Sequence, residues 1–254
     1  MIFQKALVIN DVHIPFENPR AVDLVFRVAK DLQPDLIFLN GDIMDCWEIS
    51  KYVKKLELRD KAKLSYEIER TKSFLERVVM TFPKAHVRYI FGNHEYRWAV
   101  YIANAAPELF GLKGLSLEEQ LNCPGLGIEV INSGNKESEY LWGKLLIGHF
   151  DKVNMHSGYT AKNLLEQKSI SLIQAHTHRG GSSYKRFYDR DLVAYENFCL
   201  CDRSPSYANR PNWQLGFSIV YKDQLSDFFY VEQHPIIEHE KTVSTFFNGK
   251  LYKL

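Results

Sequence analysis

Short apolar runs alternate with amphipathic stretches over the first 91 residues of the chain. Three runs of mainly apolar residues predict buried strands at Lys5–Ile9, Leu36–Leu39 and Val87–Phe91. Apolar residues recur at helical spacing after Pro19 and again from about Asp60 to Thr81, which predicts two helices between these strands. A strand–helix–strand–helix–strand order favours parallel strands joined by helical crossovers.

The pattern changes after residue 110. Several glycines between Gly111 and Gly127 indicate loops with one short helix, and a further helix is predicted around Gly158–Gln167. No linker long enough to divide domains is visible, so we expect one α/β domain over residues 1–254, with two sheets packed face to face and helices outside. The remaining predicted strands are Ile128–Ile131, Glu139–Trp142, Leu145–Ile147, Ser171–Ala175, Ser183–Phe187, Leu192–Cys199, Phe217–Tyr221, Asp227–Glu232 and Thr242–Phe247.

Charge and hydropathy limit the classes of partner. The 32 Lys and Arg residues nearly balance the 31 Asp and Glu residues, which argues against coating nucleic acid by bulk charge but leaves local basic patches open. No apolar run approaches the ~20 residues that a membrane span needs, and the N-terminus lacks the features of a signal peptide. We expect no membrane partner and a reducing, cytoplasmic location.

The four cysteines lie at positions 46, 123, 199 and 201 and show no CxxC spacing, so a disulfide scaffold or zinc ribbon is not expected. Within a strand, Cys199 and Cys201 would lie on the same face. We interpret them as small core residues rather than as a pair of metal ligands.

Candidate chemistry appears where the apolar runs end. Two aspartates, an asparagine and five histidines stand in five short blocks, in the order Asp11-Val12-His13, Gly41-Asp42, Gly92-Asn93-His94-Glu95, Gly148-His149 and His176-Thr177-His178. Ligands bind at the carboxyl ends of strands in open α/β sheets. Residues two apart at a strand end also leave on the same face. These blocks therefore predict one shared site.

The residue types fit a site with two metal ions. Cleavage of a phosphoester needs an activated water and neutralisation of charge on the phosphoryl oxygens, and two divalent ions about 3.5–4 Å apart can do both. Imidazole, carboxylate and amide ligands together suit Mn, the ion that we expect, and also Fe, Zn or Ni, rather than Ca or Mg.

In this order, Asp-x-His, Gly-Asp-x-x-Asp, Gly-Asn-His-Glu, Gly-His and His-x-His resemble the calcineurin-like metallophosphoesterase superfamily over roughly the first 180 residues. The resemblance implies a four-layer αββα sandwich of two mixed sheets, with a dinuclear metal site at the carboxyl ends of strands. It also implies hydrolysis by a hydroxide that bridges the two ions.

The resemblance implies a role for each matching residue. His94 would contact the phosphate and protonate the leaving oxygen, which suits an imidazole near neutral pH. Asp45 would orient a neighbouring side chain, with His94 as the candidate. The implied metal ligands are Asp11, His13 and His178 for one ion, Asn93, His149 and His176 for the other, and Asp42 as the bridge.

Departures from the family pattern bear on the substrate. The protein serine/threonine phosphatases continue Gly-Asp with a Val-Asp-Arg-Gly-type segment, whereas Gly41-Asp42 is followed here by Ile-Met-Asp without that arginine. A calcineurin-type protein phosphatase is therefore not expected. Glycine also precedes His149, and Phe150 follows it, where many members have His-Gly.

Several side chains are candidates for holding an anionic substrate. Arg97 either reaches a substrate phosphate or pairs with an acid such as Glu95. Segment 199–217 resembles one found in phosphoesterases of bacteriophages and prophages, and it interleaves Arg203 and Arg210 with Tyr207 and Trp213. This mixture suits a nucleotide or single strand, although we favour the alternative that the two aromatic residues fix the loop to the core. The basic segment 47–63 is either another substrate contact or a solvated helix face.

Three hypotheses follow. The leading one is a metal-dependent hydrolase of a phosphodiester or phosphomonoester, with a nucleotide-like substrate. The alternatives are an Mn-dependent DNA nuclease, which the net charge of +1 disfavours, and a non-catalytic scaffold, which the presence of His94 disfavours.

Overall fold

The computed structural model describes residues 3–51, 63–203 and 211–254. The larger of its two mixed sheets has eight strands in the order β13-β12-β11-β10-β1-β2-β3-β4, and neighbouring strands are parallel from β1 to β4 and antiparallel elsewhere. The strands of this sheet are β1 (Phe3–Ile9), β2 (Leu36–Asn40), β3 (His86–Ile90), β4 (Glu129–Ile131), β10 (Leu215–Asp223), β11 (Phe229–His239), β12 (Thr242–Phe247) and β13 (Lys250–Lys253).

The smaller sheet has five strands in the order β5-β6-β7-β9-β8. Strands β6, β7 and β9 are parallel, and the antiparallel strands β5 and β8 lie at the two edges. The strands of this sheet are β5 (Ser138–Trp142), β6 (Leu145–His149), β7 (Ser171–Gln174), β8 (Gly180–Phe187) and β9 (Arg190–Asn197).

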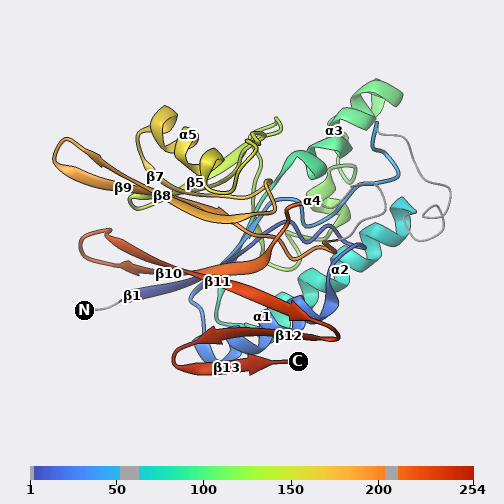
Figure 1. Cartoon of the computed structure of the whole chain (residues 1–254). Coiled ribbons are helices and arrows are strands. Elements are labelled where there is room, and N and C mark those ends of the chain that lie inside the picture. The colour runs from blue at the N-terminus through green and yellow to red at the C-terminus, as the bar shows by residue number, and fades with distance from the viewer. Residues whose placement is uncertain (1–2, 52–62, 204–210) are drawn as a thin grey trace.

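Helices cover the outer face of each sheet (Figure 1). Helix α1 begins as its sequence predicts, because Asn18 accepts a hydrogen bond from the backbone N–H of Ala21 and Pro19 occupies the first turn. The helices are α1 (Pro19–Leu32), α2 (Leu64–Thr81), α3 (Asn93–Ala105), α4 (Leu117–Gln120) and α5 (Tyr159–Lys168), with a short 3-10 turn, η2 (Pro107–Leu109).

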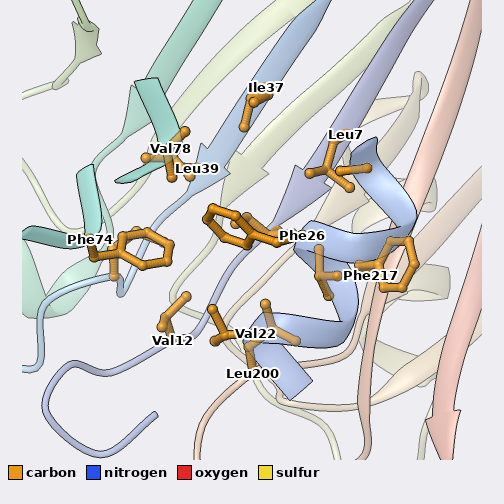
Figure 2. Close-up of a cluster of buried hydrophobic side chains, with 14 of the residues drawn as sticks. Leu7, Val12, Val22, Phe26, Ile37, Leu39, Phe74, Val78, Leu200 and Phe217 are labelled. Carbon is orange, nitrogen blue, oxygen red and sulfur yellow. The ribbon is translucent and has the colours of Figure 1, made fainter. Parts of the chain in front are cut away.

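Three hydrophobic clusters separate four layers. One lies between α1, α2 and the larger sheet, where Phe26, Phe74 and Phe217 are buried together (Figure 2). A second lies between the two sheets and includes Phe38 and Ile147. A third lies under α5 on the smaller sheet. The predicted αββα sandwich is therefore confirmed.

The crossovers predicted for the first 91 residues are confirmed, while other elements differ from the prediction. Strand β11 begins at Phe229 and continues to His239, and β13 was not predicted. Strand β9 ends at Asn197, so Cys199 and Cys201 both lie beyond it and do not share a strand. Within the described residues, no helix has both the length and the hydrophobicity needed to cross a membrane.

Candidate metal centre

Both sheets bring polar side chains to the same region. Asp11 and His13 follow β1, Asp42 follows β2, and Asn93 begins α3 after β3. His149 ends β6 of the smaller sheet, and His176 and His178 follow β7. The site predicted from the sequence blocks is therefore assembled at strand ends of both sheets.

One group of ligand atoms comes from Asp11, His13 and His178, all of them buried. Nε2 of His178 lies 3.3 Å from Oδ1 of Asp11. The Nε2 atoms of His13 and His178 are 3.0 Å apart. Two imidazole nitrogens and a carboxylate oxygen that converge in this way suit a borderline divalent ion.

A second group comes from Asp42, His149 and His176. Nε2 of His149 lies 3.2 Å from Oδ2 of Asp42 and 2.9 Å from Oδ1 of Asn93. Oδ2 of Asp42 is also 3.8 Å from Nε2 of His13, in the first group. Asp42 thus lies between the two groups, as a bridging ligand would.

Two buried polar atoms of this cluster have no hydrogen-bond partner among the described residues. They are Oδ1 of Asp11 and Nδ1 of His176. A buried polar atom without a partner is costly, and a cation would satisfy both of these. The donor set and these two atoms therefore fit a pair of divalent ions.

The charges of the carboxylates also suit cations. Burial raises the pKa of Asp11, but the adjacent His178 and His13 outweigh burial and hold that pKa far below its ordinary value. Burial likewise acts against ionisation of Asp42, yet His149 and His94 keep its pKa well below the usual range. Both carboxylates are therefore ionised.

The histidines divide into two kinds. Burial and the neighbouring His149 lower the pKa of His176 to about 4, and burial lowers the pKa of His178 as well. In contrast, the charge of Asp42 overcomes burial and raises the pKa of His149 to about 9. His176 and His178 are thus already neutral, as ligands must be, whereas an ion would replace the proton on His149.

Glycines allow two ligand residues to approach closely. Gly41 has a φ of +83°, and a Cβ atom there would lie 2.3 Å from Nδ1 of His149. A Cβ atom on Gly92 would lie 2.3 Å from Oδ1 of Asp42. Both glycines are therefore needed by the geometry of the ligands beside them.

Glu95 holds the loop after β2 against α3, a role that the sequence did not reveal. Its buried carboxylate accepts the backbone N–H groups of Asp42, Ile43, Met44 and Gly92 at 2.8–3.1 Å. It also accepts the hydroxyl of Tyr89 at 2.6 Å. Its place in the Gly-Asn-His-Glu block was the only signal, and that signal did not assign a role.

His94 lies beside the second group. Its Nδ1 donates to the backbone carbonyl of Asp45 at 2.7 Å, and its Nε2 is 3.7 Å from Oδ2 of Asp42. The carboxylate of Asp45 instead accepts from Nδ1 of His13 at 3.0 Å. Asp45 thus contacts both His94 and His13, through different atoms.

Arg97 also contacts this corner of the site. Its Nη2 lies 2.8 Å from Nε2 of His94, and its Nη1 donates to the carbonyl of Asp45 at 2.9 Å. Glu95, the acid considered as its partner, accepts the backbone and tyrosine hydrogen bonds described above. The acid that pairs with Arg97 is Asp45 instead, whose Oδ1 lies 3.7 Å from Nη1. The guanidinium therefore pairs with a nearby acid and also lies next to His94.

The segment after β9 lies partly beside the site. The ring of Trp213 meets the edge of the His178 ring, with centroids 4.3 Å apart. Arg203 pairs with Glu238 of β11 at 2.5 Å. Arg210 and Tyr207 lie outside the described residues, as do residues 52–62 of the basic segment 47–63. In the described part of this segment, Arg203 has a structural partner.

Comparison with known proteins identifies the family of this chain. A family model described as calcineurin-like phosphoesterase matches residues 5–208. The chain belongs to this family. As a calcineurin-like phosphoesterase, it is a metal-dependent hydrolase that acts on phosphoric ester bonds.

Relatives of this calcineurin-like phosphoesterase occur in bacteriophages. Gene 54 protein of Mycobacterium phage L5 is 26% identical over 233 residues, which cover 87% of this chain and 89% of that protein. Gene 54 protein of Mycobacterium phage D29 is 27% identical over 232 residues, with the same coverage.

Solved structures similar to this one include Vps29 of Chaetomium thermophilum, at 13% identity and a TM-score of 0.40, covering 99% of this chain and 97% of that one. A dimetal phosphatase from Danio rerio matches at 10% identity and a TM-score of 0.40, covering 95% of each chain.

Proposed function

We propose that this phosphoesterase hydrolyses a phosphodiester or phosphomonoester of a nucleotide-like substrate with the help of two divalent ions. The observation that carries the proposal is the pair of ligand groups that share Asp42, together with the unpartnered buried atoms of Asp11 and His176. Two ions bound there would polarise the phosphoryl group and activate the attacking water.

The ligand assignment follows the two groups. Asp11, His13 and His178 would hold one ion, and Asn93, His149 and His176 the other, with Asp42 between them. Mn is the ion that we propose, with Fe, Zn and Ni as alternatives, since a mixture of imidazole and oxygen ligands accommodates each of these.

His94 is the proposed proton donor to the leaving oxygen. The carbonyl of Asp45 accepts from its Nδ1, which leaves Nε2 on the side of Asp42 and Arg97. Nε2 accepts from Arg97 in this structure, so it would carry the proton for the leaving group once Arg97 has turned to the substrate phosphate. Asp45 acts as a positioning residue, because its carbonyl fixes the His94 ring and its carboxylate fixes His13.

Arg97 is the proposed contact to a substrate phosphate. Its guanidinium lies within hydrogen-bond distance of His94, so an anion that reaches Nε2 of His94 also reaches Arg97. Arg203, Arg210 and the basic segment 47–63 stay proposed contacts. A cytoplasmic location fits the four free cysteines.

Two substitutions test the site. We expect Asn93→Ala and His176→Ala each to abolish Mn-dependent hydrolysis of a generic aryl phosphodiester, because each variant lacks a ligand of the second ion. His156→Ala is a control, since His156 is exposed and meets the ring of Tyr159 edge to face instead. Full activity in both site variants, with wild-type metal content, would contradict the assignment.

A substrate panel tests the proposed class. Phosphomonoesters, phosphodiesters, cyclic nucleotides, and single- and double-stranded DNA are each incubated with Mn, Ni, Zn and Mg. We expect the highest kcat/KM on a small nucleotide-like ester with Mn. Preferential cleavage of DNA would favour a nuclease, and a folded, metal-loaded protein inactive on the whole panel would favour a non-catalytic scaffold.

A further inference from the structure

Two buried thiols lie against the outer side of the His178 ring. Cys199 and Cys201 are free thiols and are 0% and 3% exposed. Sγ of Cys201 lies 3.7 Å from Nδ1 of His178. The ligand atoms of Cys199, Cys201 and His178 all lie within 4.8 Å of one another.

The backbone explains how both thiols reach one imidazole. Cys199 is held against the segment just before β10, because its N–H donates to the carbonyl of Gln214 and its thiol lies 3.4 Å from that oxygen. Leu200 donates its N–H to the carbonyl of Asp11 and is buried in the core cluster. In an extended segment Leu200 faces away from the cysteines on either side of it.

His178 therefore stands between two sets of donors. Its Nε2 faces Asp11 and His13, the carboxylate and imidazole of the proposed catalytic centre. Its Nδ1 faces sulfur. Sulfur and imidazole ligands select soft or borderline ions, whereas oxygen-rich sites suit hard ones.

The distance between Cys201 and His178 is close to that of tetrahedral coordination. With Zn–S near 2.3 Å and Zn–N near 2.0 Å, neighbouring sulfur and nitrogen ligands lie about 3.5 Å apart. The Cys201–His178 distance of 3.7 Å lies close to that value. The sequence alone indicated two core residues, and the structure adds the third ligand.

We propose that Cys199, Cys201 and Nδ1 of His178 form a further binding site, which shares His178 with the catalytic centre, for a thiophilic divalent ion such as Zn2+ or Cd2+. Binding releases the protons of the two thiols and leaves the proton of the neutral imidazole on Nε2. The Nε2 atom then cannot serve the catalytic centre. A thiophilic ion would thus compete for His178 and inhibit hydrolysis, a consequence that rests on the proposed function.

Binding is tested on the full-length, metal-free protein with Cd2+, whose bonds to thiolates give an ultraviolet charge-transfer band. We expect the wild type to develop the band at about one equivalent of Cd2+. Cys201→Ser and Cys199→Ser should lose it. Cys123→Ser is the matched control, because Cys123 is also a buried free thiol but lies in a different part of the chain.

Asn93→Ala is a second control and should keep the band, because Asn93 belongs to the other ligand group. The proposal is overturned if Cd2+ binds to the wild type without a thiolate band, or if the band persists in Cys201→Ser. The wild-type result decides this even where a cysteine variant fails to fold.

Hydrolysis provides an independent measurement. In excess Mn, the Cd2+ concentration that halves activity should rise at least tenfold in Cys201→Ser relative to Cys123→Ser. Equal inhibition of these two variants would refute competition for His178. A thiolate band in a protein with no phosphoesterase activity would support the thiol site while refuting the proposed function.

Discussion

At the scale of single residues, five of the seven proposed metal ligands have a backbone conformation that is uncommon for residues with a side chain. Asp11, His13, Asp42, His176 and His178 all have φ between 48° and 77°. Such residues persist only where surrounding contacts hold them, and they gather at functional sites. The chain therefore shapes this site through its backbone as well as through its side chains.

Gly41 offers a direct test of this close fit. We expect Gly41→Ala to lower the free energy of unfolding by about 2–4 kcal/mol, because the new Cβ would meet His149 and because φ is positive. Urea denaturation measures the change. Gly249→Ala is the matched control, since φ is +73° there but no atom lies within 4 Å of the added Cβ. Equal losses in both variants would show that contact with His149 contributes nothing.

Asp151 provides a second test at this scale. Its Oδ1 lies 3.4 Å from Nε2 of His176, whose other nitrogen is the unpartnered buried atom. Partners of this kind orient a ligating histidine and typically contribute 10-fold to 100-fold to metal affinity. We expect Asp151→Ala to weaken Mn binding by about that factor in calorimetric titration. Glu129→Ala, which removes an exposed partner of Arg88, should leave the affinity unchanged.

At the scale of elements, the strands that carry the site can be predicted from the sequence. The side-chain contacts around the site are much harder to predict. Apolar runs followed by polar blocks indicated β1, β2, β3, β6 and β7, because buried parallel strands are apolar along their whole length. The sequence does not reveal the roles of three residues, because their partners lie far away in the chain and come close only in the fold. These residues are Glu95, Asp151 and Cys201. Strand β13 was missed because its four residues, Lys-Leu-Tyr-Lys, form no apolar run and only Tyr252 is buried.

Helix α2 and the loop after β2 are joined by Glu67. This buried carboxylate accepts the backbone N–H of Trp47 at 3.0 Å. Burial, reinforced by the charge of Asp45, raises the pKa of Glu67 from 4.5 to about 8. The folded state therefore holds one more proton than the unfolded state between these values, and its stability falls as pH rises through this interval.

A substitution at Glu67 should remove this pH dependence. Glu67→Gln has no proton to lose at this position. Its free energy of unfolding should therefore increase relative to that of the wild type from pH 5 to pH 8, which means that the variant becomes relatively more stable. Urea denaturation of the metal-free protein at both pH values measures the difference. Glu69→Gln, on the same helix but exposed, should show no such trend. A constant difference for Glu67→Gln would contradict the raised pKa.

At the scale of the whole molecule, the proposed centre joins the two sheets. Asp11, Asp42 and Asn93 come from the larger sheet and the helix after it, while His149 and His178 come from the smaller one. An ion that binds only the folded state stabilises it according to its concentration and affinity. Metal should therefore strengthen the packing of one sheet against the other.

Removal of metal should lower the melting temperature. At an Mn concentration 100 times Kd, each ion contributes about 2.7 kcal/mol, which corresponds to a shift of roughly 5–11 °C for a chain of this size. Calorimetric melting with Mn and with a chelator measures the shift. Asn93→Ala should show a smaller shift than the wild type. Identical melting of the wild type in both conditions would mean that metal does not bind the folded state.

The antiparallel pairing of β1 with β10 has a consequence for dissecting this chain. The family match ends at residue 208, yet β10 begins at Leu215 and covers the edge of β1 from Phe3 to Val8. A fragment cut after residue 208 would expose a row of free backbone N–H and C=O groups on the strand that precedes Asp11. Open edges of this kind recruit further chains. Such a fragment should aggregate rather than behave as a minimal enzyme.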